Sequence, residues 1–182
     1  MLSIRQYEPD DWVRIWSFLE PVLREGETFA FPRDMSTEAA RSAWTAEPRA
    51  VFVAVDEPGG EILGSYYLKP NFEGPGSHIC NCGYVVAANA RGNGVATRMC
   101  EHSQQEAARR GFRAMQFNLV VSTNETAVRL WRNMGFDIIG TIPGGFLHPR
   151  HGYVDTYIMY KALGNSIPDM SPNVTNKFDV SS

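Results

Sequence analysis

The sequence has few cysteines, no excess of positive charge and no long apolar run. Its three cysteines are too few, and odd in number, for a disulfide framework. The 17 Lys and Arg against 20 Asp and Glu give a net charge of −3, which argues against a nucleic-acid binder that works through a general basic field. No apolar run approaches the roughly 20 residues of a membrane span. The first residues also lack the basic and apolar regions of a signal peptide. We therefore expect a cytoplasmic protein without a nucleic-acid or membrane partner.

The order of predicted elements indicates a mixed α/β (α+β) fold. We expect one domain over residues 1–162 and a flexible or docked tail over residues 163–182, which is rich in Ser and Asn and has few large apolar residues. A connection over residues 143–152 contains two Pro and three Gly and is expected to be a loop. The expected strands cover residues 2–7, 50–55, 61–68, 79–86, 112–121, 136–141 and 153–160, and the expected helices cover residues 10–24, 36–47, 93–110 and 124–134.

A glycine turn between a strand and a helix is the clearest motif. Residues 86–96 read VAANARGNGVA, so Gly92 and Gly94 stand where an apolar strand has ended and a helix begins. Glycines let the backbone approach an anion closely, and the free N–H groups and positive dipole end of the helix then bind it. Arg91 adds a positive charge. We interpret the turn as a pyrophosphate cradle; the alternative is that the glycines merely turn the chain.

Two segments resemble the GNAT acetyltransferases. RGNGVA over residues 91–96 resembles their R-x-x-G-x-A core, and NETAVRLWRNMGF over residues 124–136 resembles their N-x-x-A-x-x-L-[YW]-x-x-x-G-F segment. The resemblance covers roughly residues 2–162. It implies a mixed, mostly antiparallel sheet that splays at its central strands, with helices on both faces and acetyl-CoA inserted in the split.

The resemblance also implies which residues bind the cosubstrate. Backbone groups of residues 84–86 are expected to pair with the pantetheine like an added strand, and N–H groups across residues 92–97 are expected to hold the pyrophosphate. Asn124 is expected to bond the pantetheine arm, with a helix N-cap as its alternative role. The expected cofactor-binding residues are Tyr84, Val85, Val86, Arg91, Gly92, Asn93, Gly94, Val95, Ala96, Thr97 and Asn124.

Acetyl transfer to an amine requires a neutral amine and a polarised thioester. The N–H of Val86 is the expected oxyanion donor. Glu27, in the loop between the first two helices, could act as a base through water or bind an ammonium, or it could be merely an exposed carboxylate. Many family members carry Tyr at the position of Trp131 as the acid for the departing thiolate. An indole cannot supply that proton at neutral pH, so we expect Trp131 to pack as a wall.

Asn81 and Asn118 are polar residues in the middle of two strands that we expect to be central and buried. Asn is depleted in strands and costly to bury unpaired, which favours a functional role; the alternative is that each bonds a bulge or a buried water. Together with Asn124 and GETF over residues 26–29, they resemble the fungal acetyltransferases of azetidine-2-carboxylate and other proline analogues. In those enzymes the counterparts of Asn81 and Asn118 belong to the substrate and catalytic site.

The sequence thus predicts an acetyl-CoA-dependent N-acetyltransferase that acts directly on a small, amino-acid-like amine. The alternatives are a protein Lys or N-terminal acetyltransferase and a non-catalytic CoA-binding module. The aromatic-rich segment over residues 29–31 and the expected loop over residues 143–152 argue against an open groove for a protein substrate. We expect no metal, because the cysteines and histidines lack a known ligand spacing. The expected partner is a small-molecule amine, and a homodimer is left open.

Overall fold

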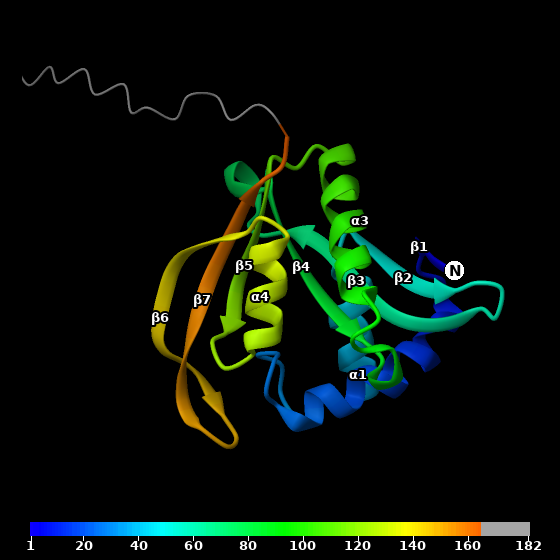
Figure 1. Cartoon of the computed structure of the whole chain (residues 1–182), viewed down its shortest axis with the longest axis horizontal. Coiled ribbons are helices and arrows are strands. Elements are labelled where there is room, and N and C mark those ends of the chain that lie inside the picture. The colour runs from blue at the N-terminus through cyan, green and yellow to red at the C-terminus, as the bar shows by residue number, and fades with distance from the viewer. Residues whose placement is uncertain (165–182) are drawn as a thin grey trace, which may run out of the picture.

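The computed structural model describes residues 1–164. Their seven strands form one sheet, which helices flank (Figure 1). The strand order is β1-β2-β3-β4-β5-β7-β6, and neighbours are antiparallel except for the parallel pair β4 and β5. This arrangement confirms the predicted α/β (α+β) class with a mixed, mostly antiparallel sheet. Of the predicted tail, residues 165–182 lie outside the described residues. The strands are β1 (Leu2–Gln6), β2 (Ala50–Asp56), β3 (Glu61–Pro70), β4 (Ile79–Val86), β5 (Ala114–Val121), β6 (Asp137–His148) and β7 (Gly152–Ala162).

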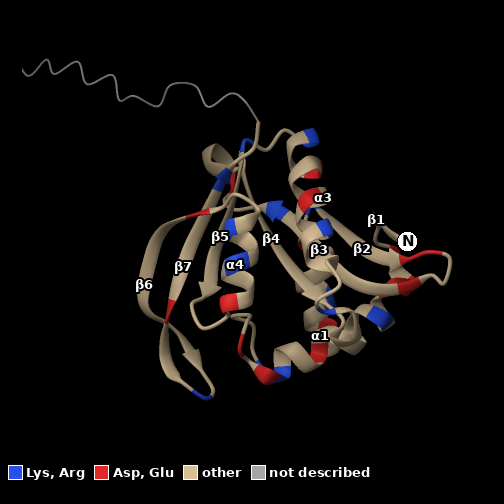
Figure 2. Cartoon of the chain, viewed as in Figure 1, with Lys and Arg blue, Asp and Glu red and all other residues tan. Residues whose placement is uncertain are grey.

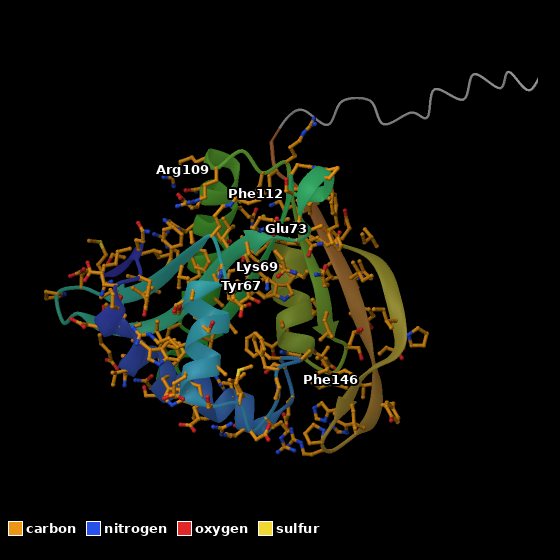
Figure 3. The ribbon with its side chains drawn as sticks, turned by 180° about the vertical axis from the view of Figure 1, so that it is seen from behind. Tyr67, Lys69, Glu73, Arg109, Phe112 and Phe146 are labelled. Atoms are coloured by element: carbon orange, nitrogen blue, oxygen red, sulfur yellow. The ribbon has the colours of Figure 1, made fainter. Side chains whose placement is uncertain are left out.

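Helices cover both faces of the sheet, as predicted. Figure 1 shows α3 and α4 in front of the sheet, and Figure 3, turned by 180°, shows the N-terminal helices in front. The helices are α1 (Trp12–Glu25), α2 (Thr37–Arg41), which continues as a π-helical turn η2 (Ser42–Ala46), α3 (Val95–Arg109) and α4 (Glu125–Asn133). Short 3-10 turns cover Pro9–Asp11, Gly74–Gly76 and Ala88–Ala90. No helix within residues 1–164 is long and apolar enough to cross a membrane.

Aromatic side chains pack on both faces of β3, because successive residues of a strand point to opposite faces. On one face, Trp44 of η2 packs edge-on against Tyr67, with ring centroids 5.0 Å apart, and donates its indole N–H to Ser65 Oγ at 3.1 Å. On the other face, Tyr66 stacks on Phe52 of β2, with ring centroids 5.1 Å apart. All of these residues are buried, so β3 is fixed between the two helical layers.

The sheet splits between β4 and β5. The two strands pair only at Ile79 with Ala114 and at Cys80 with Met115, and they diverge beyond these residues. The splay that the family resemblance implies is therefore confirmed. Neither strand carries a charged residue, and Figure 2 shows both in tan along their length. The split is thus lined by uncharged strands, with charged residues at its margins.

The connection over residues 143–152, predicted as a loop, is mostly β-structure. Strands β6 and β7 extend into it from both sides, so only residues 149–151 form the turn. Pro143 lies in a bulge, where the register with β7 shifts between Ile142 and Phe146. The prediction was wrong because β6 is an edge strand, and an edge strand with a bulge tolerates residues that would interrupt a central one.

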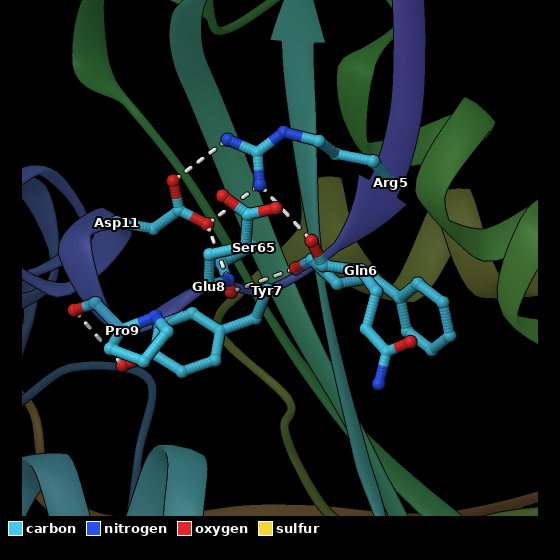
Figure 4. A network of polar contacts seen from close by, with 8 residues as sticks. Arg5, Gln6, Tyr7, Glu8, Pro9, Asp11 and Ser65 are labelled. Atoms are coloured by element: carbon cyan, nitrogen blue, oxygen red, sulfur yellow. Dashed lines mark hydrogen bonds and ion pairs between the residues drawn. The ribbon is translucent and has the colours of Figure 1, made fainter.

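A partly buried ion pair fixes the start of α1 to β1 (Figure 4). Arg5 donates from both terminal nitrogens to the carboxylate of Asp11, at 2.7 Å each, and the Glu8 N–H donates to the same carboxylate at 2.7 Å. Burial alone would raise the pKa of Asp11, but the hydrogen bonds from Arg5 and Glu8 and the Arg5 charge outweigh it and lower that pKa. Asp11 is therefore held in its charged form in the folded protein.

Candidate active site

Alternate residues of β4 direct their backbone N–H and C=O groups into the split, because the residues between them pair with β3. The Ala87 N–H donates to the Leu63 carbonyl at 2.8 Å. Because hydrogen-bonded residues alternate along an antiparallel pair, Val85 also pairs with β3, whereas Tyr84 and Val86 direct their N–H and C=O groups toward β5. The expectation that all three residues offer backbone groups to the cosubstrate is therefore corrected: the backbone of Val85 is already used within the sheet.

A first cleft of about 490 Å³ lies beside these free backbone groups. Helix α4 and the loop between α1 and α2 contribute to its walls. Of the expected cofactor-binding residues, it is lined by Tyr84, Val85, Val86, Arg91, Ala96 and Asn124. The other expected residues, Gly92, Asn93, Gly94, Val95 and Thr97, do not line the cleft and instead form the turn and the first helical turn beside it.

The glycine turn has the backbone that the sequence motif requires. Gly92 and Gly94 have φ angles of 80° and 76°, a left-handed conformation that L-residues adopt only with strain. An added Cβ would meet nothing within 4 Å at either glycine, so the requirement is conformational rather than steric. Gly94 is the N-cap of α3, and no side chain of the described residues caps this end. The first N–H groups of α3 are therefore available to an anion.

Asn124 caps helix α4. Its side-chain oxygen accepts the Ala127 N–H at 3.2 Å, which is the alternative role that the sequence offered. Asn124 also lines the first cleft, so the same residue caps α4 and contributes to the cleft wall.

Trp131 packs as an aromatic wall. Its ring centroid lies 5.0 Å from that of Tyr84 and 4.9 Å from that of Phe117. The Tyr84 hydroxyl is bonded to Ser103 Oγ of α3 at 2.7 Å, and burial raises the pKa of Tyr84 well above its usual range. The Tyr84 phenol is thus fixed to α3 and does not replace the tyrosine that many family members carry at position 131.

A second cleft of about 350 Å³ adjoins the first. The two clefts share wall residues that include Tyr84, Asn124 and Trp131. The second cleft adds Phe29, Phe31, Tyr67, Lys69, Asn81 and Asn118. A Cβ on Gly83 would lie 2.4 Å from the Tyr67 ring, so glycine at this position makes room for that ring beside β4.

Asn81 and Asn118 face each other across the split and are joined by a residue that the sequence analysis missed. The side-chain oxygen of Asn71 accepts from Asn118 Nδ2 at 2.6 Å and from Asn81 Nδ2 at 3.4 Å. The expected burial was wrong, because Asn81 is half-buried and Asn118 is exposed. Asn118 lies where the register between β5 and β7 shifts, so a bulge turns it out of the regular ladder. A third Asn directly after β3, next to Ile79 in the hairpin, was the available signal.

Glu27 lies in the first cleft, apart from the two asparagines. Its Oε2 accepts from Arg150 at 2.8 Å and lies 4.0 Å from Nε2 of the buried His148. Both partners belong to the end of the β6–β7 hairpin and were missed, since nothing local in the sequence relates residue 27 to residue 150. The four candidate catalytic residues therefore divide between the clefts, with Glu27 and Val86 in the first and Asn81 and Asn118 in the second.

The cysteines are buried single thiols. Cys80, Cys82 and Cys100 are unpaired, and burial raises the pKa of Cys82 well above its usual range and that of Cys100 to about 11. No group of His, Cys, Asp and Glu residues within residues 1–164 could hold a metal ion.

Comparisons with known proteins agree with this architecture. Over 98 residues the chain is 41% identical to N-acetyltransferase aca1 of Schizosaccharomyces pombe; the match covers 53% of this chain and 47% of that protein. The chain thus spans about half the length of this curated relative. It is 44% identical to the solved GCN5-related N-acetyltransferase from Kribbella flavida, with a TM-score of 0.84 over 89% of this chain and 98% of the other.

A more distant structure shares the fold. A phosphinothricin acetyltransferase from Sinorhizobium meliloti, solved in complex with acetyl-CoA, is 21% identical with a TM-score of 0.79, covering 91% of this chain and 90% of the other. Residues 12–136 match the model of the acetyltransferase (GNAT) family, and that match spans both segments on which the resemblance rests. The chain is therefore a member of the acetyltransferase (GNAT) family.

Proposed function

We propose that the chain transfers the acetyl group of acetyl-CoA directly to the amine of a small, amino-acid-like molecule. The observation that carries this proposal is the split between β4 and β5, where two clefts meet at Trp131. The first cleft begins beside the uncapped start of α3, which follows the glycine turn, and the second is lined by amides and aromatic rings. Such an arrangement suits a long cosubstrate on one side and a small acceptor on the other.

The residues of the first cleft fit acetyl-CoA. The free backbone groups of Tyr84 and Val86 can pair with the pantetheine amides as an added strand would. The N–H groups after Gly94 and the guanidinium of Arg91 can neutralise the pyrophosphate. The side-chain oxygen of Asn124 already accepts the Ala127 N–H of α4. Its Nδ2 is therefore the group that can donate a hydrogen bond to a pantetheine carbonyl. This chain therefore offers donors for the pantetheine arm and for the pyrophosphate of the cosubstrate.

The reaction proposed is a direct attack within a ternary complex. The neutral amine nitrogen bonds to the thioester carbon, the carbon–sulfur bond breaks, and CoA leaves as a thiolate that takes up a proton from water. The Val86 N–H, which faces the split, stabilises the oxyanion, and the amine proton passes to water or, through water, to Glu27. A thiol of pKa about 8.5 leaves without an acid. The raised thiol pKa values argue against an acetylated cysteine, since only a thiolate attacks efficiently.

The second cleft supports a small acceptor with polar substituents. Asn81 and Asn118 can orient a polar group without adding charge, while Phe29 and Phe31 provide apolar surface for a carbon skeleton. A volume of about 350 Å³ is enough for a molecule of amino-acid size.

A panel of amines with acetyl-CoA, read by release of free CoA thiol, tests the proposal. The panel includes proline, azetidine-2-carboxylate, azetidine, several primary amino acids and a lysine peptide. We expect release with at least one small amine and an acetylated product whose mass is confirmed. Release only with the peptide would favour a protein acetyltransferase, and no release with any member would contradict the proposed activity.

A further inference from the structure

Lys69 is a half-buried cation in the second cleft. Its Nζ lies 5.5 Å from the centroid of the Tyr67 ring, and Figure 3 shows the two residues close together on the side of the sheet seen from behind. The ion pairs among residues 1–164 involve other cations, and none includes Lys69. The Lys69 ammonium therefore lies in the cleft without a carboxylate partner among residues 1–164 and is free to bind an anionic ligand.

The ladder between β3 and β4 places this cation beside the amides of the second cleft. Lys69 is directly opposite Asn81 in the register. Opposite residues in an antiparallel pair project to the same face, with Cβ atoms about 4.5 to 5.5 Å apart. Lys69, Asn81 and Asn118 accordingly line the same cleft. A ligand held by the ammonium would therefore also contact the amides.

Aromatic rings complete the cleft. Phe29 and Phe31 lie with ring centroids 5.9 Å apart, and Phe29 packs edge-on against Trp44 at 5.7 Å. These rings provide an apolar surface beside the polar ammonium and amide groups. The cleft thus combines one cation, the amides of Asn81 and Asn118 and an apolar wall, which is complementary to a short carbon skeleton with one carboxylate.

We propose that Lys69 binds the carboxylate of the acceptor, so that the second cleft selects small α-amino or α-imino acids over plain amines. This inference rests on the proposed acetyl transfer and specifies its substrate class. The Lys69 ammonium donates hydrogen bonds to the carboxylate, the rings of Phe29 and Phe31 contact the carbon skeleton, and the amine nitrogen points toward the shared wall at Trp131. Lys69 is then a specificity-determining residue rather than a catalytic one.

The test compares each acidic acceptor with its decarboxylated amine, for example azetidine-2-carboxylate with azetidine, on the wild type and on Lys69→Met. We expect the wild type to prefer the carboxylate. Lys69→Met should raise KM for the carboxylate about 10- to 100-fold, the range for loss of a hydrogen bond to a charged group, should change KM for azetidine far less, and should leave KM for acetyl-CoA unchanged. Lys69→Arg should restore most of the preference, and Arg41→Met on the exposed face of α2 is the matched loss of one cation elsewhere.

The possible results separate this inference from the proposed function. If the wild type acetylates the decarboxylated amines as well as the acids, the carboxylate site is wrong and the acetyl transfer stands. If Lys69→Met weakens both kinds of acceptor equally, with Lys69→Arg no better, Lys69 supports the cleft only structurally and the inference fails. If no amine is acetylated, the proposed function fails and this inference fails with it.

Discussion

Replacing Gly94 by Glu should weaken CoA binding at least about tenfold without unfolding the protein. Gly94 stands at the start of α3 with a φ of 76°, next to open space. The variant adds a carboxylate to the turn that we expect to hold the pyrophosphate, so it combines backbone strain with like-charge repulsion. The two effects act on different quantities: strain lowers the stability of the fold, whereas repulsion lowers the affinity for CoA.

The loss of stability and the loss of CoA affinity differ in size. Strain at a positive φ costs about 1 kcal/mol, which corresponds to a fall of about 2–4 °C in Tm for a chain of this length. Two unit charges 4 Å apart repel by about 1 kcal/mol in bulk water and about 4 kcal/mol at a protein surface. Since Gly94 is exposed, the lower part of that range applies, and repulsion by two phosphates should weaken CoA binding at least about tenfold.

Gly111→Glu is a matched control. Gly111 follows the other end of α3, has a φ of 84° and also meets nothing within 4 Å. Both variants should lose similar stability by thermal unfolding, but only Gly94→Glu should lose CoA affinity by calorimetry, and Gly94→Gln should fall between Gly94→Glu and the wild type. Equal CoA affinities for Gly94→Glu and Gly111→Glu would refute the assignment of the turn as a pyrophosphate cradle.

Three further outcomes are expected. Trp131→Phe should keep turnover within about threefold, because the ring acts as a wall; a loss above a hundredfold in steady-state kinetics would instead assign a role to the indole N–H. Asn71→Leu, which removes the oxygen that accepts from Asn81 and Asn118, should raise KM for the acceptor and leave CoA affinity unchanged, whereas Asn71→Asp, which keeps an acceptor oxygen, should be milder; equal effects would exclude the orienting role. Because the folded-state pKa of Asp11 is lowered, its contribution to stability is present above about pH 4 and is lost as the pH falls through that folded value. Asp11→Asn should therefore lower the free energy of unfolding by about 1.5 kcal/mol near pH 7, which corresponds to a fall in Tm of about 3–6 °C. Near pH 2 the same substitution should change Tm little. An equal loss of Tm at both pH values would contradict the ion-pair account.

The sequence allowed most elements to be predicted because local signals mark them. Apolar spacing defines α1, and helices α3 and α4 are followed by Gly111 and Gly135, both at positive φ as their place after a helix suggests. The split between β4 and β5 followed from the family resemblance rather than from periodicity. The edge strand β6 was missed over residues 143–148, since Pro and Gly in a bulge have the composition of a loop.

Individual residues of the candidate site could be predicted from the sequence, but most of the contacts between them could not. The glycine turn and Asn124 could be located from motifs, but the pairing of Glu27 with Arg150 joins residues 123 positions apart. The contacts of Asn71 likewise depend on the register of two hairpins and on a bulge beside Asn118. Register is set by long-range packing, and a single sequence does not specify it.

The turnover of Asn118→Ala at saturating acetyl-CoA tests the central claim most directly, because Asn118 lines the second cleft, which we propose to bind the acceptor, and does not line the first cleft, which we propose to bind the cosubstrate. The proposed function predicts that kcat falls on the order of a hundredfold through loss of acceptor orientation, with CoA affinity within twofold of wild type. Unchanged turnover with the best acceptor of the panel would contradict the assignment of the second cleft as the acceptor site.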